Sequence, residues 1–228
     1  MIRVAASVEG WCEDDFFKEI LAPHLLGHGV ILQPIILQTS REPSGKKHKG
    51  GSVSVGRVVA DLRRLQSSFA YLTTFFDLYR FRDRKESETA EQLATRIAEA
   101  FGTSGKLIPY VQQYEYETLF LADPKALADH FRAEAIAADA HAAVRSAGGA
   151  EQVNDGPDTA PSKRIGAWCA SHSGQRYDKQ SKRRHALPIA KAITLGVMRQ
   201  ACPLFDAWVT RMETLGATSK GGGCHATR

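Results

Sequence analysis

Apolar and polar positions in the first half of the chain switch between two periods, and this predicts strands and helices in turn. Unbroken apolar runs predict buried strands at residues 2–8, 29–37, 70–76 and 107–113. Between them, apolar residues recur every three or four positions, which predicts helices after residue 13, after Ser52 and around residues 90–97. This alternation is typical of an α/β fold: a mainly parallel sheet in a three-layer core with helices on both faces.

Prolines and polar residues modify this pattern at three places. Pro23 is expected to kink or shorten the first helix. Pro34 favours an edge position or a bulge for the second strand, because proline cannot donate to a central ladder. The polar stretch 40–51 is expected to be a loop.

The second half of the chain has no strand pattern. Residues 124–147 are rich in alanine and predict helix, 148–161 read as a polar loop, and helices are expected at about 187–200 and 203–215. We therefore expect an α/β core over 1–123, a helical and basic C-terminal extension packed on the core over 124–215, and a flexible tail over 216–228.

Charge adds a weak pointer to an anionic partner. The chain has 228 residues, a formal net charge of +5 and a pI near 9.1. Its basic residues cluster in 46–49 and in 163–185, which indicates either a nucleic-acid surface or solvated surface charge. Four dispersed cysteines indicate reduced thiols, and no apolar stretch is long enough for a membrane span, so we expect a cytoplasmic protein without a membrane partner.

Carboxylates follow the predicted strands. Glu9 closes the first strand, Asp77 the third, and the pair Glu115 and Glu117 the fourth. Because parallel strands share one C-terminal edge, these residues are expected on one rim, where α/β sheets build their sites. Glu13, one turn into the first helix, faces back toward the same rim.

Converging carboxylates stay ionised together only with a cation among them. Oxygen ligands of this kind suit Mg²⁺ or Mn²⁺, which can activate water and stabilise the leaving oxygen in phosphodiester cleavage. The alternative is that each acid is a helix cap or a surface residue. Whether residue 115 continues the strand or begins a helix, Glu115 and Glu117 point to different sides, so one of the two is favoured as a ligand.

A basic element supplies the opposite charge. Pro161 suits the first turn of a helix, whose backbone N–H groups can bind an anion. Lys163 could assist a phosphate as a catalytic residue and Arg164 could grip it, or both could form ion pairs with the rim acids. Tyr177 and Lys179 could follow a nucleic-acid backbone.

Several ordered motifs resemble the DUF4276 family over residues 2–215. They are Val8-Glu9-Gly10-x-x-Glu13, Thr73–Tyr79, Gln113–Phe120, Asn154–Arg164 and Cys202-Pro203-Leu204-Phe205-x-x-Trp208. That family looks like a compact relative of Toprim domains, especially those of overcoming-lysogenisation-defect nucleases. The resemblance implies a Toprim-like core, with Glu9 as the invariant glutamate and Asp77 as the first acid of an Asp-x-Asp motif. It also implies an ATPase partner encoded nearby in a phage-defence or mobile-element setting.

The sequence departs from this pattern at Tyr79, which replaces the second Asp, and at Trp11, Cys12, Arg80 and Phe81. No ATP-binding loop, serine-nucleophile elbow or zinc-protease motif is present in the sequence. Two hypotheses follow. The first is a Mg²⁺- or Mn²⁺-dependent nuclease acting on DNA or RNA, with DNA favoured and a homodimer left open. The second is a non-catalytic module that binds nucleic acid or an ATPase.

Overall fold

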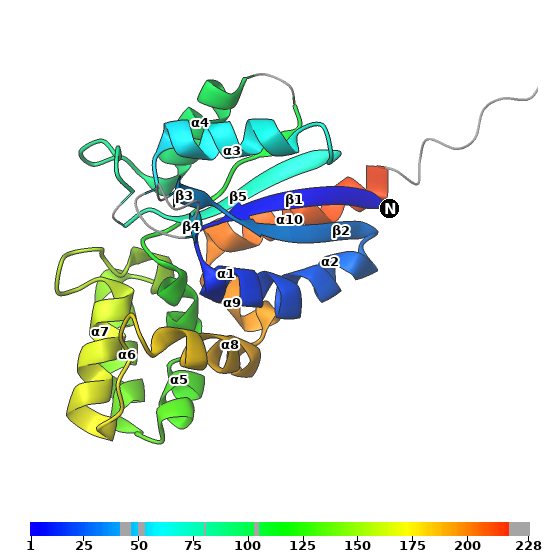
Figure 1. Cartoon of the computed structure of the whole chain (residues 1–228). Coiled ribbons are helices and arrows are strands. Elements are labelled where there is room, and N and C mark those ends of the chain that lie inside the picture. Colours follow the sequence, from blue (N-terminus) through cyan, green and yellow to red (C-terminus); the bar gives the residue numbers. More distant parts are fainter. Residues whose placement is uncertain (42–46, 50–52, 80, 103–104, 219–228) are drawn as a thin grey trace, which may run out of the picture.

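A five-stranded, all-parallel sheet forms the centre of the protein in a computed structural model (Figure 1). The structure describes residues 1–41, 47–49, 53–79, 81–102 and 105–218. The strand order is β2-β1-β5-β6. β7 also pairs with β5, at Phe76 and Asp77, which lie further along that strand than the residues paired with β6. The strands are β1 (Ile2–Val8), β2 (Val30–Ile36), β5 (Tyr71–Asp77), β6 (Leu107–Ile108) and β7 (Val111–Gln112).

The mixed α/β fold with a parallel sheet is therefore confirmed. β1 pairs with β2 from Ile2↔Val30 to Val8↔Ile36, and with β5 from Val4↔Tyr71 to Val8↔Phe75. Pro34 lies in β2, which is the edge strand, as its missing N–H requires. The central pair β1 and β5 is almost wholly buried, which explains why both read as continuous apolar runs.

Helices cover both faces of the sheet (Figure 1). One face packs against α3 (Val55–Leu65) and α4 (Ala90–Phe101), and α4 begins with a capping box between Thr89 and Gln92. The other face packs against the continuous α1 (Trp11–Phe16), η1 (Phe17–Leu21) and α2 (Ala22–Gly27), and against α10 (Pro203–Thr218). The Trp208 indole of α10 donates to Thr73 Oγ1 of β5 at 2.9 Å, so the last helix belongs to the core packing.

The remaining helices form a lobe beside the C-terminal edge of the sheet (Figure 1). Leu119, Phe131, Ile165 and Ile189 from this lobe belong to the same hydrophobic core as β1, so the lobe is packed on the core. Its elements are η2 (Tyr116–Ala122), α5 (Pro124–Phe131), α6 (Ala135–Ala147), η3 (Ala150–Gln152), α7 (Pro161–Trp168), η4 (Cys169–Ser173), α8 (Lys182–Ile193) and α9 (Leu195–Ala201).

Several details differ from the expectations. The strand predicted at 107–113 is two short strands, β6 and β7, which both pair with β5. Within 40–51, expected as loop, the described residues contribute to an antiparallel pair, β3 (Gln38–Arg41) with β4 (Lys47–Lys49). The chain before Pro23 takes a π-helical turn, η1, which accommodates the proline without ending the helix. Helix α10 continues to Thr218, so 216–218 are helix rather than tail, and 219–228 lie outside the described residues. No described helix has the length and apolarity needed to cross a membrane.

Candidate functional site: a carboxylate rim

Two carboxylates stand at neighbouring strand ends. Glu9 directly follows β1 and Asp77 is the last residue of β5, and these strands pair in parallel up to Val8↔Phe75. The Asp77 backbone lies close enough to the Glu9 carboxyl to lower its pKa, so the two strand ends adjoin. The topology therefore brings the two predicted acids together.

Glu13 reaches the same place from the first turn of α1. It is buried, with 4% of its surface exposed. Gly10 is the N-cap of α1, and a Cβ built on it would lie 3.2 Å from Glu13 Oε2. A larger residue at position 10 would therefore press on this carboxylate, which gives the glycine after Glu9 a steric reason.

A sharp turn after β7 introduces the fourth carboxylate. Tyr114 has a positive φ of 62°, a left-handed conformation that costs a non-glycine residue free energy. It redirects the chain into η2, whose first N–H, that of Tyr116, donates to Asp77 Oδ1 at 2.8 Å. The Tyr79 N–H donates to the Tyr114 carbonyl at 2.7 Å and holds the turn against the end of β5. Glu117 is thereby fixed beside Asp77, and only 1% of it is exposed.

Glu115 points elsewhere. Its Oε2 accepts the Ser162 N–H at 2.8 Å, and its Oε1 accepts the Ser162 hydroxyl at 2.9 Å. It thus caps the N-terminus of α7, the position at which a phosphate was expected. Both oxygens have a donor, so Glu115 is the less suitable ligand of the pair.

Two residues of the later chain contact Glu117. The Tyr177 hydroxyl donates to Glu117 Oε1 at 2.9 Å, and Lys182 Nζ lies 3.3 Å from the same oxygen. The other oxygen, Oε2, is buried and has no hydrogen-bond partner among the described residues. A buried carboxylate oxygen without a donor is costly, and it marks a place where a ligand would be stabilised.

Burial and mutual repulsion raise the pKa values of the rim acids. Desolvation, followed by repulsion from Glu13, raises the pKa of Glu9 to about 7. Desolvation also raises the pKa of Glu13, and it raises that of Asp77 well above its ordinary value, with Glu9 and Glu13 adding to the effect. Attraction by Glu117 raises the pKa of Lys182, so this lysine is the cation of the rim.

The basic residues expected at the rim lie in different surroundings. Lys163 and Lys179 are exposed. Arg164 Nε donates to the Thr159 carbonyl at 2.7 Å and its Nη2 lies 3.5 Å from Asn154 Oδ1, so this side chain holds the 154–159 loop. Tyr177 is buried with 5% exposed, which differs from the expected role along a nucleic-acid backbone.

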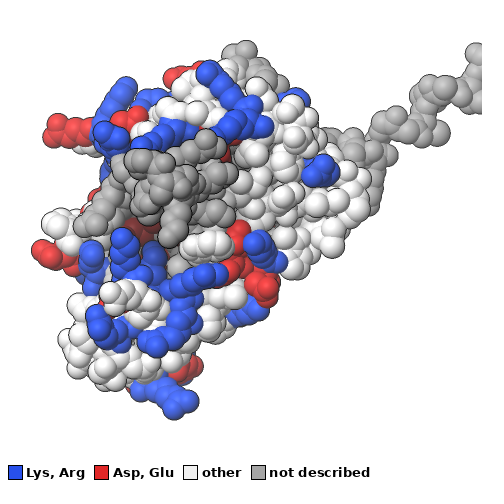
Figure 2. Space-filling view, in the orientation of Figure 1, with Lys and Arg blue, Asp and Glu red and all other residues white. Residues whose placement is uncertain are grey.

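Lys182 is the rim residue that sequence reasoning did not single out. It stood in a run of basic residues between 176 and 185, with nothing to separate it from its neighbours. One available signal was helical spacing. Lys182 is 7 and 11 residues before Ile189 and Ile193, so it lies on the face of α8 that these buried residues turn toward the core. Figure 2 shows Lys and Arg side chains gathered over the helical lobe, which is consistent with an anionic ligand on this side.

The rim matches a hard divalent cation in its donor chemistry. One lysine contacts Glu117 and interacts electrostatically with Glu9, Glu13 and Asp77, and carboxylate oxygen is the donor that Mg²⁺ prefers. However, no three of these carboxylates place oxygen atoms as close together as the ligands of one bound ion. Among described residues, three His, Cys, Asp or Glu donors lie within 4.8 Å of one another at His24, His28 and Glu213, and not at the rim.

Comparison with known proteins assigns the family. The model described as "Domain of unknown function (DUF4276)" matches residues 8–213, a range that contains every rim residue, Tyr177 and Lys182. The chain therefore belongs to the DUF4276 family. Neither a search of curated proteins nor a search of solved structures found a match.

Proposed function

We propose that this protein is a metal-dependent nuclease, which hydrolyses phosphodiester bonds at the carboxylate rim with Mg²⁺ or Mn²⁺. The observation that carries the proposal is the imbalance of charge at the rim. Four carboxylates from separate elements face one lysine, and the pKa values of three of them are raised because the fold crowds and buries them. Such crowding weakens a structure unless a cation is bound, and it is typical of functional sites.

Each residue has a distinct role in this proposal. Glu9, Asp77 and Glu117 would hold the metal, because Glu9 and Asp77 lie at strand ends and Glu117 has an oxygen without a partner among the described residues. Glu13 would bind directly or orient a water molecule. A bound Mg²⁺ or Mn²⁺ would supply an activated water and charge stabilisation for the leaving oxygen.

Lys182 takes the role that the sequence had suggested for Lys163. Its Nζ is held at the rim by Glu117 and its side chain remains 31% exposed, so it can contact a phosphate that approaches from solvent. Tyr177 positions Glu117 from the opposite side through its hydroxyl. Lys163, Lys179 and other exposed lobe residues would attract the polyanion and contribute to salt-dependent binding.

The wider setting of the proposal comes from the resemblance to Toprim-like nucleases. It comprises a Toprim-like core, DNA as the preferred nucleic acid, and an ATPase partner in phage defence. The positive net charge and the basic lobe support an anionic polymer as the ligand.

The test is cleavage of supercoiled plasmid, single-stranded DNA and RNA by the full chain, with Mg²⁺ or Mn²⁺, with and without the ATPase of a neighbouring gene. We expect Asp77→Asn and Glu9→Gln to lower cleavage by about 100-fold or more. Glu88→Gln is the matched control, because Glu88 is a buried carboxylate whose oxygens pair with Arg96 and the Lys85 N–H rather than with a rim residue. Equal cleavage by wild type, Asp77→Asn and Glu9→Gln would refute the nuclease.

A second candidate, a binding module without catalysis, is favoured by Tyr79 and by the spacing of the rim donors. Thermal denaturation with Mn²⁺ separates the two candidates. Stabilisation that disappears in Asp77→Asn and persists in Glu88→Gln supports an intact metal site. No response in any variant, together with retained binding of labelled DNA, supports the module.

A further inference from the structure

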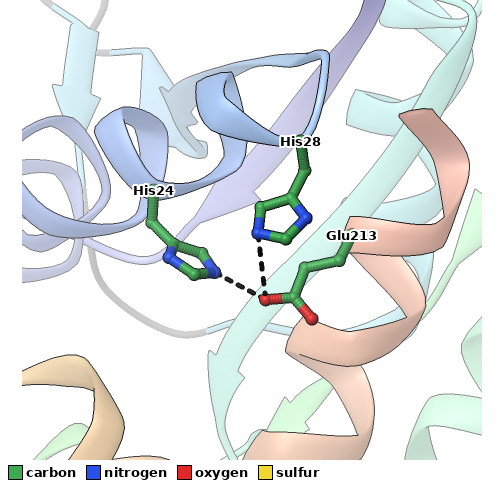
Figure 3. Close-up of side chains that lie close together, drawn as sticks. All are labelled: His24, His28 and Glu213. Atoms are coloured by element: carbon green, nitrogen blue, oxygen red, sulfur yellow. Dashed lines mark hydrogen bonds and ion pairs between the residues drawn. The ribbon is translucent and has the colours of Figure 1, made fainter. Parts of the chain in front are cut away.

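A second constellation of ligands lies away from the carboxylate rim. His24 of α2 and His28, which ends that helix, are four residues apart and therefore lie on one face. Glu213 of α10 approaches them from the C-terminal part of the chain (Figure 3). One donor atom from each of the three side chains lies within 4.8 Å of the others.

The three side chains point at one another (Figure 3). His24 Nε2 lies 2.6 Å from Glu213 Oε1, and His28 Nε2 lies 3.6 Å from the same oxygen. Two ligands of a tetrahedral zinc ion are separated by about 3.4 Å, given metal–ligand bonds near 2.1 Å. The His28 distance already agrees with this separation, and the His24 distance requires a movement of less than about 1 Å.

The backbone around this cluster is held closely. A Cβ built on Gly216 of α10 would lie 1.6 Å from the His28 carbonyl oxygen, so only glycine allows the helix to approach the turn. Gly29 follows with a φ of 80°, which reverses the chain into β2. The close approach fixes the position of Glu213 relative to His28, as a preorganised ligand set requires.

Arg199 supplies a second layer around the carboxylate. Its Nη2 donates to Glu213 Oε2 at 3.2 Å and also to Thr210 Oγ1 at 2.9 Å, and its Nη1 lies 2.6 Å from Oε1. The bond to Oε2 can persist while Oε1 faces an ion, and hydrogen bonds of this kind orient metal-binding carboxylates. The contact of Nη1 with Oε1 is the one that an ion would displace.

We propose that His24, His28 and Glu213 form a binding site for a transition metal ion of the Zn²⁺ class, which links α2 to α10. Two imidazoles and one carboxylate are a zinc ligand set with a fourth position open to water. His28 is 43% exposed and His24 30%, so an ion can enter from solvent. The site is independent of the proposed nuclease chemistry, because its ligands are nitrogen-rich and suit a softer ion than Mg²⁺.

The test measures zinc binding by the full chain after treatment with a chelator. Titration calorimetry should give one Zn²⁺ per chain, and saturating Zn²⁺ should raise Tm by roughly 5–10 °C. Co²⁺ in place of Zn²⁺ should give the visible absorption of a four-coordinate site. His28→Gln should weaken Zn²⁺ affinity about tenfold or more, and this variant preserves the pairs of Glu213 with His24 and Arg199.

His172→Gln is the matched control. His172 Nε2 lies 2.7 Å from Asp139 Oδ2 and is 30% exposed, but no third ligand in the described part of the chain completes that pair. The double variant Glu9→Gln with Asp77→Asn should retain zinc binding. Equal zinc affinity in wild type and in His28→Gln, or loss of binding on changing His172, would overturn the proposed site.

Discussion

The buried carboxylate Glu88 and the buried carboxylates of the rim have pKa values shifted in opposite directions. Glu88 is 6% exposed, and both of its oxygens accept from Arg96, at 2.7 Å and 2.8 Å. The Lys85 N–H adds a further donor at 3.0 Å, and the hydrogen bond with Arg96 lowers the pKa of Glu88. At the rim, burial and neighbouring acids instead raise the pKa values of Glu9, Glu13 and Asp77.

The difference separates a structural carboxylate from one that is available for chemistry. The fold gives Glu88 its own guanidinium and, among the described residues, places it in no group of three metal-ligating side chains, so that group is complete without a ligand. The rim acids share Lys182, and Glu117 Oε2 has no donor among the described residues. A site with more carboxylates than the fold neutralises must take up protons or a cation, so it has something left to bind.

The largest expected effect comes from removing the shared cation. Lys182→Met should destabilise the metal-free protein by about 3 kcal/mol at pH 8, because it leaves buried carboxylates uncompensated. The loss should be smaller at pH 5, where the acids can take up protons. Urea denaturation of both proteins in chelator, at the two pH values, measures this. If the variant loses equal stability at both, the rim is not crowded as we describe.

The second effect concerns pH. The folded protein holds a proton on Glu9 up to pH of about 7, whereas the unfolded chain releases it near 4.5. The contribution of Glu9 to stability is therefore complete below about pH 4.5 and is lost as pH rises through about 7.

Relative to Glu9→Gln, the metal-free wild type should lose about 2 kcal/mol of stability between pH 5 and pH 8. Glu88 should act in the opposite sense, because its contribution is lost as pH falls below its ordinary range. Denaturation of wild type and Glu9→Gln between pH 5 and pH 8 checks the first sign, and denaturation of wild type and Glu88→Gln from about pH 6 down to about pH 3 checks the second. A constant difference between wild type and Glu9→Gln would contradict the raised pKa.

A third change tests the completed carboxylate. Glu88→Gln should cost about 1.5 kcal/mol, the size of a charge-assisted hydrogen bond, and leave the response to Mn²⁺ unchanged. Thermal denaturation with and without Mn²⁺ gives both quantities. A lost Mn²⁺ response in this variant would contradict the distinction between Glu88, as a structural carboxylate, and the rim acids, as metal ligands.

The smallest effect should come from Ser162→Ala. Glu115 would lose the hydroxyl donor and keep the Ser162 backbone N–H, so the cost should be about 0.5–1 kcal/mol. Nuclease activity and metal response should be unaffected, since Glu115 caps α7. A large loss of activity would instead indicate that Glu115 takes part in the metal site.

Much of the core could be predicted from the sequence, because its signals are local. The strands β1 and β5 end at Val8 and Asp77, within one residue of the ends predicted from their apolar runs. Parallel topology then places Glu9 beside Asp77, since the C-terminal ends of such strands share an edge.

The rest of the site depends on contacts between distant segments. Lys182 is 65 positions from Glu117 in the sequence, and Tyr177 is 60 positions from it. No periodic pattern in the sequence encodes contacts at these separations. The divergence of Glu115 and Glu117 was predictable, but which of the two faces the rim depends on the turn at Tyr114, whose left-handed conformation its residue type does not announce. Tertiary packing of the lobe decides these positions, so local rules could not.

The position of α10 has a consequence for synthesis. Trp208 stacks on Tyr110 with ring centroids 4.8 Å apart and packs against Phe75, so one face of the sheet is completed by residues about 100 positions later. At about 5–20 residues per second, a ribosome needs roughly 5–20 s to translate that interval. For that time the nascent sheet lacks the cover that α10 gives to Phe75 and Tyr110, and transiently exposed apolar surface of this kind favours binding by chaperones.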